Sequence, residues 1–339
     1  MGGKASCRTS IRLVQITAPM WPKRIYVSMH FPVRHLFWLS DVANKRSMKS
    51  VAAVKTSDND RLSESQRGAL ISLLGDDDAA VYQTVRTKLL SFGHQAVDWL
   101  RPYLLSSEPL LRRRAKEIMD HFGRQDADER FMNFCASRGE DLPLEEGSWL
   151  LAKTQYPDIN IDAYAALLDS FAASLKCRID FTSDAEQVVA SINNYLFQEL
   201  SFSPNEANYY DPENSFLNRV IDHRTGNPLS LCTVYLLLAR RLKLPVTGIG
   251  LPGHFVCRYQ NSMAEIYIDA FNRGKLLTKA DCIKYLVHTH HGLEEGYLAP
   301  VTPRRMLLRM CANLHQIYLR NEQSEETARF QRYLVALAK

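Results

Sequence analysis

The sequence predicts an α+β protein that is mostly helical and carries one small antiparallel sheet. Two observations lead to this class. Apolar residues recur at helical spacing over most of residues 65–200 and again after residue 280. Between these parts, residues 245–271 hold three short segments that are rich in β-branched and aromatic residues and bounded by turn residues. The three segments are the expected strands.

The first 56 residues differ in charge from the rest of the chain. They contain ten Lys or Arg and one acid, Asp41, a net charge of +9; since the whole chain carries +5, the remainder carries −4. The stretch has little helical or strand periodicity. We expect a disordered leader here, or a targeting arm, or a start assigned too early with Met48 as the true first residue.

Composition excludes several classes of protein. A mildly acidic body argues against a broad nucleic-acid surface, and no apolar run approaches the roughly 20 residues of a membrane span. The seven cysteines are odd in number and form no CxxC, which favours free thiols in a reducing compartment. His288, His290 and His291 cluster, but the nearby sequence adds no further ligand set. We therefore expect a cytoplasmic protein without a metal or other cofactor.

Residues 57–125 are predicted to form a first helical segment after a polar linker. Gly75 and Gly93 each follow an apolar stretch and are expected helix stops. Paired amphipathic helices at this spacing resemble HEAT-type repeats, and a plain helical bundle is the alternative. Arg112 to Arg114 are expected on a solvated helix face.

Further along, residues 126–200 are also helical by pattern, and residues 301–339 are predicted to form a two-helix hairpin. The segment 201–300 lies between them and contains the expected strands. It also contains a helix that is apolar on nearly every side from Leu229 to Leu242. A helix of this kind is buried, so we expect it to pack on the sheet.

The start of this helix suggests chemistry. Asn227 suits a helix cap, Pro228 suits the first helical position, and Cys232 follows one turn later. A helix N-terminus carries free N–H groups and partial positive charge, which lower the pKa of a nearby thiol and stabilise an oxyanion. Cys232 is therefore either a nucleophile or a core residue.

Strand register links a histidine with an acid. If residues 254–259 and 264–269 form a hairpin with a four-residue loop at 260–263, His254 lies directly opposite Asp269. Directly opposed side chains share one face of a sheet. The carboxylate would then orient the imidazole and raise its basicity. The alternative is a turn histidine and an unrelated aspartate at a strand end.

Five long stretches resemble a known family. They are "DLPLEEGSWLLAKTQYPD", "NYLFQELSF", "YYDPENSFLNRVIDHRTGNPLSL", "ARRLKLPVTGIGLPGHFVCRY" and "IDAFNRGKLL". On these stretches, residues 127–339 resemble the SirB-type transglutaminase-like proteins of bacteria. The resemblance implies a core of the papain-type superfamily, in which a buried helix packs on an antiparallel sheet. It also implies a tetratricopeptide-like C-terminal tail, and a related domain in an animal F-box protein.

The resemblance also implies site residues. In active transglutaminase-like enzymes the buried helix begins with the nucleophilic cysteine, and a histidine and an aspartate come from adjacent strands. His254 and Asp269 match those two positions. The family spacing of 17 residues, counted back from Pro245, lands on Pro228. Proline therefore occupies the position where the resemblance predicts the nucleophile.

The two nearest residues that could replace the nucleophile are Ser230 and Cys232, and they point in different directions from the helix. At about 100° per residue, Ser230 points roughly 200° away from the direction of Pro228. Cys232 returns to within about 40° of that direction, but roughly 6 Å deeper. A thiol at that depth in apolar surroundings has a raised pKa and is inert.

Two functions remain open. One is a thiol-dependent acyl transferase or protease that acts on amide bonds, with Cys232 as nucleophile, His254 as base and Asp269 as orienting acid. The other, favoured by the proline at the nucleophile position, is a binding or regulatory module with a degenerate site. Its helical repeats would bind a protein partner; in the enzyme they would bind a polypeptide substrate. A hydrolase that uses Ser230 or a bound water is a third alternative.

The polar segment before the helix is expected to line a cleft in any of these functions. Its candidate residues are Asn218, Arg224 and Asn227. The plainer alternative is that Asn227 only caps the helix and that Arg224 forms a surface pair with Asp222.

Overall fold

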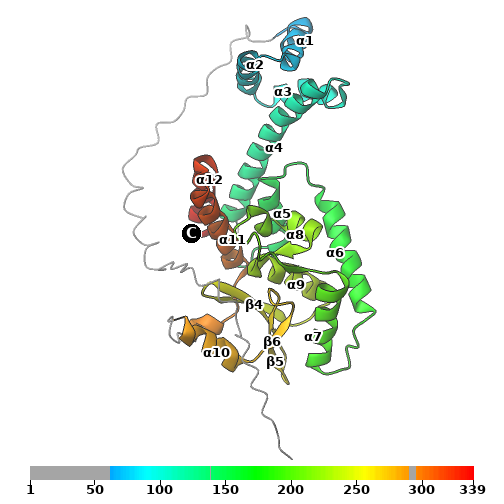
Figure 1. The fold of residues 1–339 in the computed structure, drawn as a ribbon, viewed down its shortest axis with the longest axis vertical. Coiled ribbons are helices and arrows are strands. Elements are labelled where there is room, and N and C mark those ends of the chain that lie inside the picture. The colour runs from blue at the N-terminus through cyan, green and yellow to red at the C-terminus, as the bar shows by residue number, and fades with distance from the viewer. Residues whose placement is uncertain (1–61, 138, 290–294) are drawn as a thin grey trace, which may run out of the picture. The chain divides into compact units, whose positions relative to one another are not determined.

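A computed structural model describes residues 62–137, 139–289 and 295–339 (Figure 1). The predicted basic leader, residues 1–56, lies outside the described residues, as do His290 and His291. The described chain is mostly helical with small sheets, which confirms the predicted α+β class.

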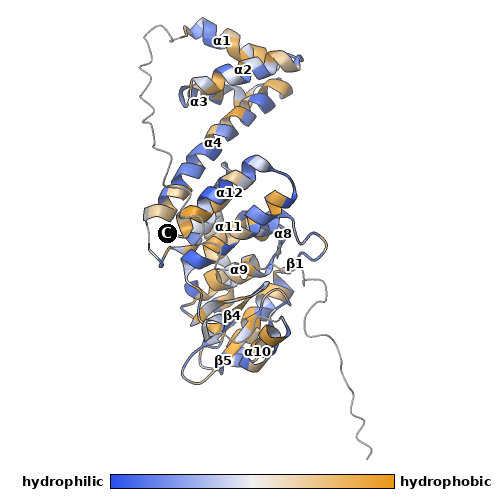
Figure 2. Cartoon of the chain, turned by 90° about the vertical axis from the view of Figure 1, so that its left-hand side faces the viewer, coloured by the Kyte–Doolittle hydropathy of each residue, from blue (hydrophilic) through white to orange (hydrophobic). Residues whose placement is uncertain are grey.

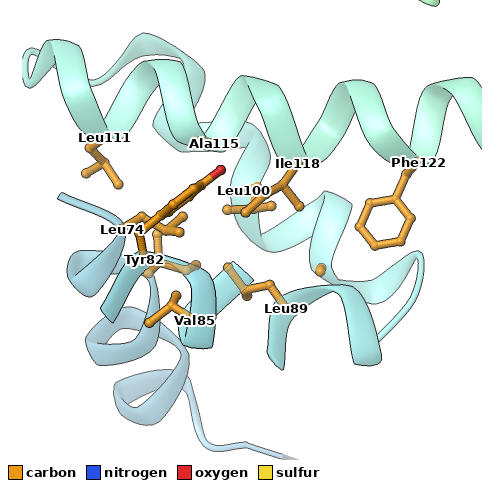
Figure 3. Packing of buried hydrophobic residues seen from close by; sticks show 11 residues of the cluster. Leu74, Tyr82, Val85, Leu89, Leu100, Leu111, Ala115, Ile118 and Phe122 are labelled. Atoms are coloured by element: carbon orange, nitrogen blue, oxygen red, sulfur yellow. The ribbon is translucent and has the colours of Figure 1, made fainter. Parts of the chain in front are cut away.

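Three helices open the described chain, each ended by a tight turn. They are α1 (Glu64–Ser72), α2 (Ala79–Ser91) and α3 (Gln95–Leu100), with the 3₁₀ turns η4 (Leu73–Gly75) and η5 (Arg101–Leu105). Gly93 follows α2 with φ 61°, a left-handed conformation that glycine adopts without strain, so the predicted stop is confirmed. The apolar faces of these helices pack against the next helix in one cluster that includes Leu74, Leu89, Leu100, Ile118 and Phe122 (Figure 3).

The long helix α4 (Pro109–Ser137) continues past the boundary expected at residue 125. Gly123 lies inside this helix and does not end it. A Cβ at Gly123 would lie 2.8 Å from the Cβ of Pro157, so the glycine permits close packing of α4 on that proline. The expected boundary between residues 125 and 126 therefore falls within a continuous helix.

Arg114, on the same helix, is not solvated as predicted. Only 8% of the residue is exposed, and its Nη1 donates to the carbonyl of Leu74 at 2.8 Å and also to that of Asp76. Its guanidinium lies 4.4 Å from the ring centroid of Tyr82. Arg114 therefore binds the carbonyls at the end of η4, which local sequence could not reveal because its partners lie about 40 residues away.

Four helices follow and surround a central one. They are α5 (Leu144–Lys153), α6 (Ile161–Lys176), α7 (Ala185–Asn193), which continues as a π-helical segment η6 (Asn194–Glu199), and α8 (Leu217–His223), which follows the 3₁₀ turn η7 (Pro212–Ser215). The central helix α9 (Pro228–Arg241) packs against α6 and α8.

The predicted C-terminal hairpin is present as α11 (Pro303–Arg320) and α12 (Ser324–Leu337), which pack against each other. Arg304, near the start of α11, donates to the carbonyls of Leu337 and Ala336 at the end of α12. It also donates to the carbonyl of Cys135 in α4 at 3.1 Å. A guanidinium matches these three carbonyls because it carries five donors in one plane. The hairpin is thereby tied to α4.

The main sheet has one strand more than predicted. Its antiparallel order is β3 (Val246–Leu251), β4 (His254–Gln260), β5 (Glu265–Asp269) and β6 (Lys275–Leu277). A second, parallel sheet joins β1 (Ser203–Pro204) and β2 (Thr225–Gly226). Strands of two or three residues are too short to show alternation in sequence, which explains why β1, β2 and β6 were missed.

The predicted register of the β4–β5 hairpin is wrong. Gln260 pairs with Glu265, so the four-residue loop is 261–264 and not 260–263. The side chain of Asn261 accepts the N–H groups of Met263 and Ala264 at 2.9 and 2.8 Å, and this side-chain turn sets the loop one residue later. Continuing the register places Asp269 level with Val256, two residues from His254.

The sheet is covered on both faces. α9 packs on β3 and β4, whereas α10 (Lys279–His288) packs on β5 and β6. Figure 2 shows apolar residues gathered in this region. Side chains on β4 are therefore buried whichever way they point, as its burial pattern confirms. The prediction that the apolar helix is buried against the sheet is confirmed.

Candidate functional site

His254 and Asp269 meet inside the protein. His254 Nε2 lies 2.9 Å from Asp269 Oδ2, and the two residues are only 3% and 0% exposed. His254 begins β4 and Asp269 ends β5. Because the register error is two residues, the two side chains keep the same face, and they interact as diagonal neighbours. The structure thus brings the predicted pair together by a different route.

Asn272 completes the surroundings of the carboxylate. Its backbone N–H donates to Asp269 Oδ1 at 3.2 Å, and its Nδ2 donates to Oδ2 at 2.7 Å. Burial raises the pKa of Asp269, but the charge and hydrogen bond of His254 and the bonds from Asn272 lower it further, so the net pKa lies below its ordinary value of 3.8. The carboxylate is therefore ionised at neutral pH. Sequence analysis missed Asn272, although an Asp followed three residues later by a donor is a common local turn.

Residues from α10 and α11 hold the turn before His254. The Tyr285 hydroxyl donates to the carbonyl of Pro252 at 2.7 Å. Arg309 Nη2 donates to the carbonyls of Leu251 and His254 at 2.9 and 2.8 Å. The rings of Tyr285 and Phe271 lie 6.2 and 6.3 Å from the imidazole. No sequence signal connected Arg309 with the histidine, because the two are 55 residues apart.

The helix side of the site begins with a capping box. Asn227 Oδ1 accepts the N–H of Ser230 at 2.9 Å, and Ser230 Oγ accepts the N–H of Asn227 at 3.0 Å. Asn227 Nδ2 also donates to Ser215 Oγ at 3.0 Å. The cap that sequence analysis offered as the plain alternative for Asn227 is present, and the Ser230 hydroxyl is part of it.

Cys232 lies in the core. The residue is 0% exposed, and its Sγ lies 3.5 Å from the carbonyl oxygen of Phe255. The nearby Cys257 Sγ lies 3.7 Å from the carbonyl oxygen of Cys232. Burial raises the pKa of the Cys232 thiol well above its ordinary value of 9.0, and the neighbouring Cys257 thiol raises it further. Cys232 is therefore a neutral thiol at physiological pH.

Strand alternation predicts which way the side chains of β4 point. Cys257 points toward α9, where it contacts Cys232, so Phe255 points the same way and His254 points to the opposite face. That opposite face carries Asp269 and lies next to Tyr285 of α10. The Cys232 thiol itself lies near the end of β5, where the backbone N–H of Ala270 lowers its pKa in part and the charge of Asp269 raises it.

Pro228 and Asn218 are buried near the start of α9. Pro228 occupies the first helical position, where its missing N–H leaves no unpaired donor. Asn218, in α8, is only 3% exposed, and its Oδ1 has no hydrogen-bond partner among the described residues. Neither residue supplies a nucleophile.

Arg224 is not paired with Asp222, so that alternative is wrong. It ends α8 in the left-handed conformation, at φ 56°. Its guanidinium lies 4.7 and 4.9 Å from the ring centroids of Phe171 and Phe202. The side chain stacks between two aromatic rings, and its Nη1 is buried without a hydrogen-bond partner in the described part of the chain.

Within residues 62–137, 139–289 and 295–339, no group of three or more His, Cys, Asp or Glu is placed to hold a metal ion. No helix in these ranges is both long and apolar enough to cross a membrane.

Comparison of the sequence with known proteins places the chain in a family. Residues 162–312 match the profile of the Transglutaminase-like superfamily. A UPF0162 protein of Xylella fastidiosa is 34% identical over 204 residues, which cover 58% of this chain and 72% of that protein. The chain belongs to the UPF0162 family of transglutaminase-like proteins. The matched range, residues 162–312, contains Cys232, His254 and Asp269, whereas most of the N-terminal helices lie outside it.

Other similar proteins are more distant or more partial. A UPF0162 protein of Vibrio cholerae is 26% identical over 196 residues, 56% of this chain and 72% of that protein. F-box only protein 21 of Mus musculus is 35% identical over 136 residues, 38% of this chain and 21% of that protein. No solved structure matches the chain. The UPF0162 core is thus similar to a domain within a much longer mammalian protein.

Proposed function

We propose that this UPF0162 protein is a non-catalytic, SirB-type transglutaminase-like module that binds a polypeptide partner in the cytoplasm. The observation that carries the proposal is the burial of Cys232 on the α9 side of β4. A neutral thiol without solvent contact is a poor nucleophile. The proline at the position expected for the nucleophile supports the same conclusion.

The flanking helices supply the binding surfaces in this proposal. Residues 57–125 act as a HEAT-like segment, residues 126–200 as the helical first part of the SirB-type region, and residues 301–339 as a tetratricopeptide-like hairpin behind the core at 201–300. Paired helices in such repeats present long surfaces to other polypeptides. The tie between Arg304 and both α12 and α4 supports this role, because it holds the hairpin against the N-terminal helices.

Alkylation of the native protein tests the proposal. Among the described cysteines, Cys177 is exposed and serves as an internal standard, whereas Cys232 is buried. With iodoacetamide at neutral pH, followed by peptide mass spectrometry, we expect modification of Cys177 and protection of Cys232 until the protein is unfolded in urea. The His254→Ala variant should give the same pattern. Modification of Cys232 faster than Cys177, and suppressed by His254→Ala, would refute a non-catalytic role.

A second candidate, the thiol-dependent acyl transferase or protease, has one specific observation in its favour. The His254–Asp269 pair has the distance and burial of an orienting acid with its base. To use Cys232, the first turn of α9 would have to open so that a substrate could reach the buried thiol. Hydrolysis of peptide p-nitroanilides that is lost in both Cys232→Ala and His254→Ala would establish this enzyme.

A further inference from the structure

A partly enclosed cavity of about 350 Å³ lies between α3, η5, α4 and the segment that follows α5. Part of its wall is apolar and consists of Val97, Leu104, Met119, Phe122 and Pro157. Phe122 also closes one end of the helical cluster (Figure 3). Val97 and Met119 pack against the same cluster, so the wall rests on well-ordered core residues.

Acidic side chains lie on the same cavity. Asp120, Asp126 and Asp158 line it together with Lys116 and His94, so its formal charge is −2 when the histidine is neutral. Lys116 contacts Asp120 at 3.2 Å and also contacts Asp158. One ammonium group therefore serves two carboxylates. Asp126 has His94 as its ion-pair partner, at 3.1 Å, and its side chain remains 44% exposed.

The carboxyl group of Asp120 lies between opposing influences. Burial raises its pKa above the ordinary value of 3.8 and the charge of Asp158 raises it further, while Lys116 and Arg124 lower it in part. A second cation in the cavity would relieve this repulsion. Charge complementarity thus favours a positively charged group as the ligand of this cavity.

An exposed leucine lies beside the cavity. Leu105 is 91% exposed and follows Leu104, which lines the wall, in the same 3₁₀ turn. A side chain that docks in the cavity would bring its neighbours in the partner chain close to Leu105. Burying such a leucine on contact removes apolar surface from water and so stabilises a complex.

We propose that this cavity binds a lysine or arginine side chain of a protein partner, and that an apolar residue of the same partner covers Leu105. The aliphatic stem of the basic side chain packs on the apolar wall. Its charged head reaches Asp126 and Asp158, which remain partly open to solvent. The inference rests on the proposed function, since it names the chemistry of the partner that the helical segment recognises.

Labelled peptides test the recognition directly. The probes are fluorescent pentapeptides with a central arginine next to a leucine, and matched peptides with citrulline, which has almost the same shape without the charge. Fluorescence polarisation with the full chain should give saturable binding of the arginine peptide and binding about tenfold weaker for citrulline. Equal binding of both peptides, or no saturable binding of either, would overturn the proposal.

Variants locate the binding on this cavity. Asp126→Asn removes one carboxylate and should weaken the arginine peptide about fivefold while leaving the citrulline peptide unchanged. Asp98→Asn is the matched control, because Asp98 lies on α3 with its side chain 79% exposed but does not line the cavity. Leu105→Ala should weaken the leucine-containing peptide but not one with alanine instead. An equal loss in Asp98→Asn and Asp126→Asn would show non-specific attraction and refute the assignment.

This outcome is separable from that of the proposed function. If Cys232 proves reactive while the peptide still binds, the cavity serves an enzyme's substrate and the non-catalytic role fails. If Cys232 is protected and no peptide binds, the non-catalytic role stands and the cavity assignment fails.

Discussion

The strand side and the helix side of the site differ in what they retain. On the strands, His254 and Asp269 form a buried pair in which Asn272 provides the remaining donors. On the helix, the first position is proline and Cys232 is enclosed by apolar residues one turn deeper. One half of a transglutaminase-like site thus keeps its polar geometry while the other half has become core. One half can change without the other, because the strand residues are held by hydrogen bonds and the helix residue is held by core packing.

The electrostatics of the two sides differ for the same reason. Asp269 is fully buried, yet three hydrogen bonds and a neighbouring imidazole keep its pKa below the ordinary value. Cys232 is buried equally, and burial together with the Cys257 thiol raises its pKa, while one backbone N–H, that of Ala270, lowers it only in part. Burial alone therefore does not decide the protonation state; the number of donors that reach the group decides it.

The largest expected effect is on the strand side. Asp269→Ala leaves His254 and Asn272 buried without their acceptor, so the free energy of unfolding should fall by about 3 kcal/mol. Urea denaturation followed by circular dichroism measures this change. The exposed control Asp98→Ala should change stability by less than about 0.5 kcal/mol. A loss below about 1 kcal/mol for Asp269→Ala would mean that the pair is not a structural unit.

Restoring a thiol at the helix start sharpens the comparison next. In Pro228→Cys the new thiol lies at the first position of α9, where the helix N–H groups lower its pKa. Position 228 is buried, as Cys232 is, so we expect iodoacetamide to modify the new thiol more slowly than the exposed Cys177 at neutral pH. Adding His254→Ala should leave that rate unchanged. Modification faster than that of Cys177, and suppressed by His254→Ala, would show that the helix start is accessible and aligned with the strand side.

Removing the native thiol should have a smaller effect. Cys232→Ala takes one buried sulfur out of the contact with Phe255 and should lower the free energy of unfolding by about 1 kcal/mol. Labelling of Cys177 should stay the same. The exposed control Cys177→Ala should be neutral within about 0.5 kcal/mol. If Cys232→Ala instead abolishes a peptidase activity while stability is kept, the helix side is catalytic.

The smallest effect concerns pH. The pKa of Asp269 is lower in the folded protein than its ordinary 3.8, so its contribution to stability is present above about pH 4. That contribution is lost as the pH falls through 3.8 toward the folded value. Asp269→Asn should therefore lose less stability than the native protein between neutral pH and pH 3, by about 1 kcal/mol or less. An equal loss of stability in both proteins as the pH falls would contradict the lowered pKa of Asp269.

Local signals in the sequence predicted much of the fold. The stop at Gly93, the cap at Asn227 and the C-terminal helix hairpin are all present, since each depends on neighbouring residues. The expected boundary at residue 125 falls inside α4, where Gly123 permits close packing on Pro157. Short strands such as β6 gave no signal, because three residues do not establish an alternation.

At the site, the residue spacing of the hairpin predicted that His254 and Asp269 share a face but not how the two strands pair. The parity of His254 and Asp269 was right although their register was wrong, because a shift of two residues keeps both side chains on one face. The turn made by Asn261 was the missing information. Arg309 could not be found from sequence, because its role depends on where α11 packs.

The sequence by itself determined the mostly helical class, the three longer strands, that α9 is buried, and that His254 and Asp269 share a face. These properties follow from periodicity, caps and side-chain alternation, which act over a few residues. Only the tertiary structure decided that Cys232 is enclosed in the core, and that Asn272 and Arg309 hold the strand side in place. The physical reason is that a side chain's reactivity depends on the groups packed around it, and those groups come from distant parts of the chain.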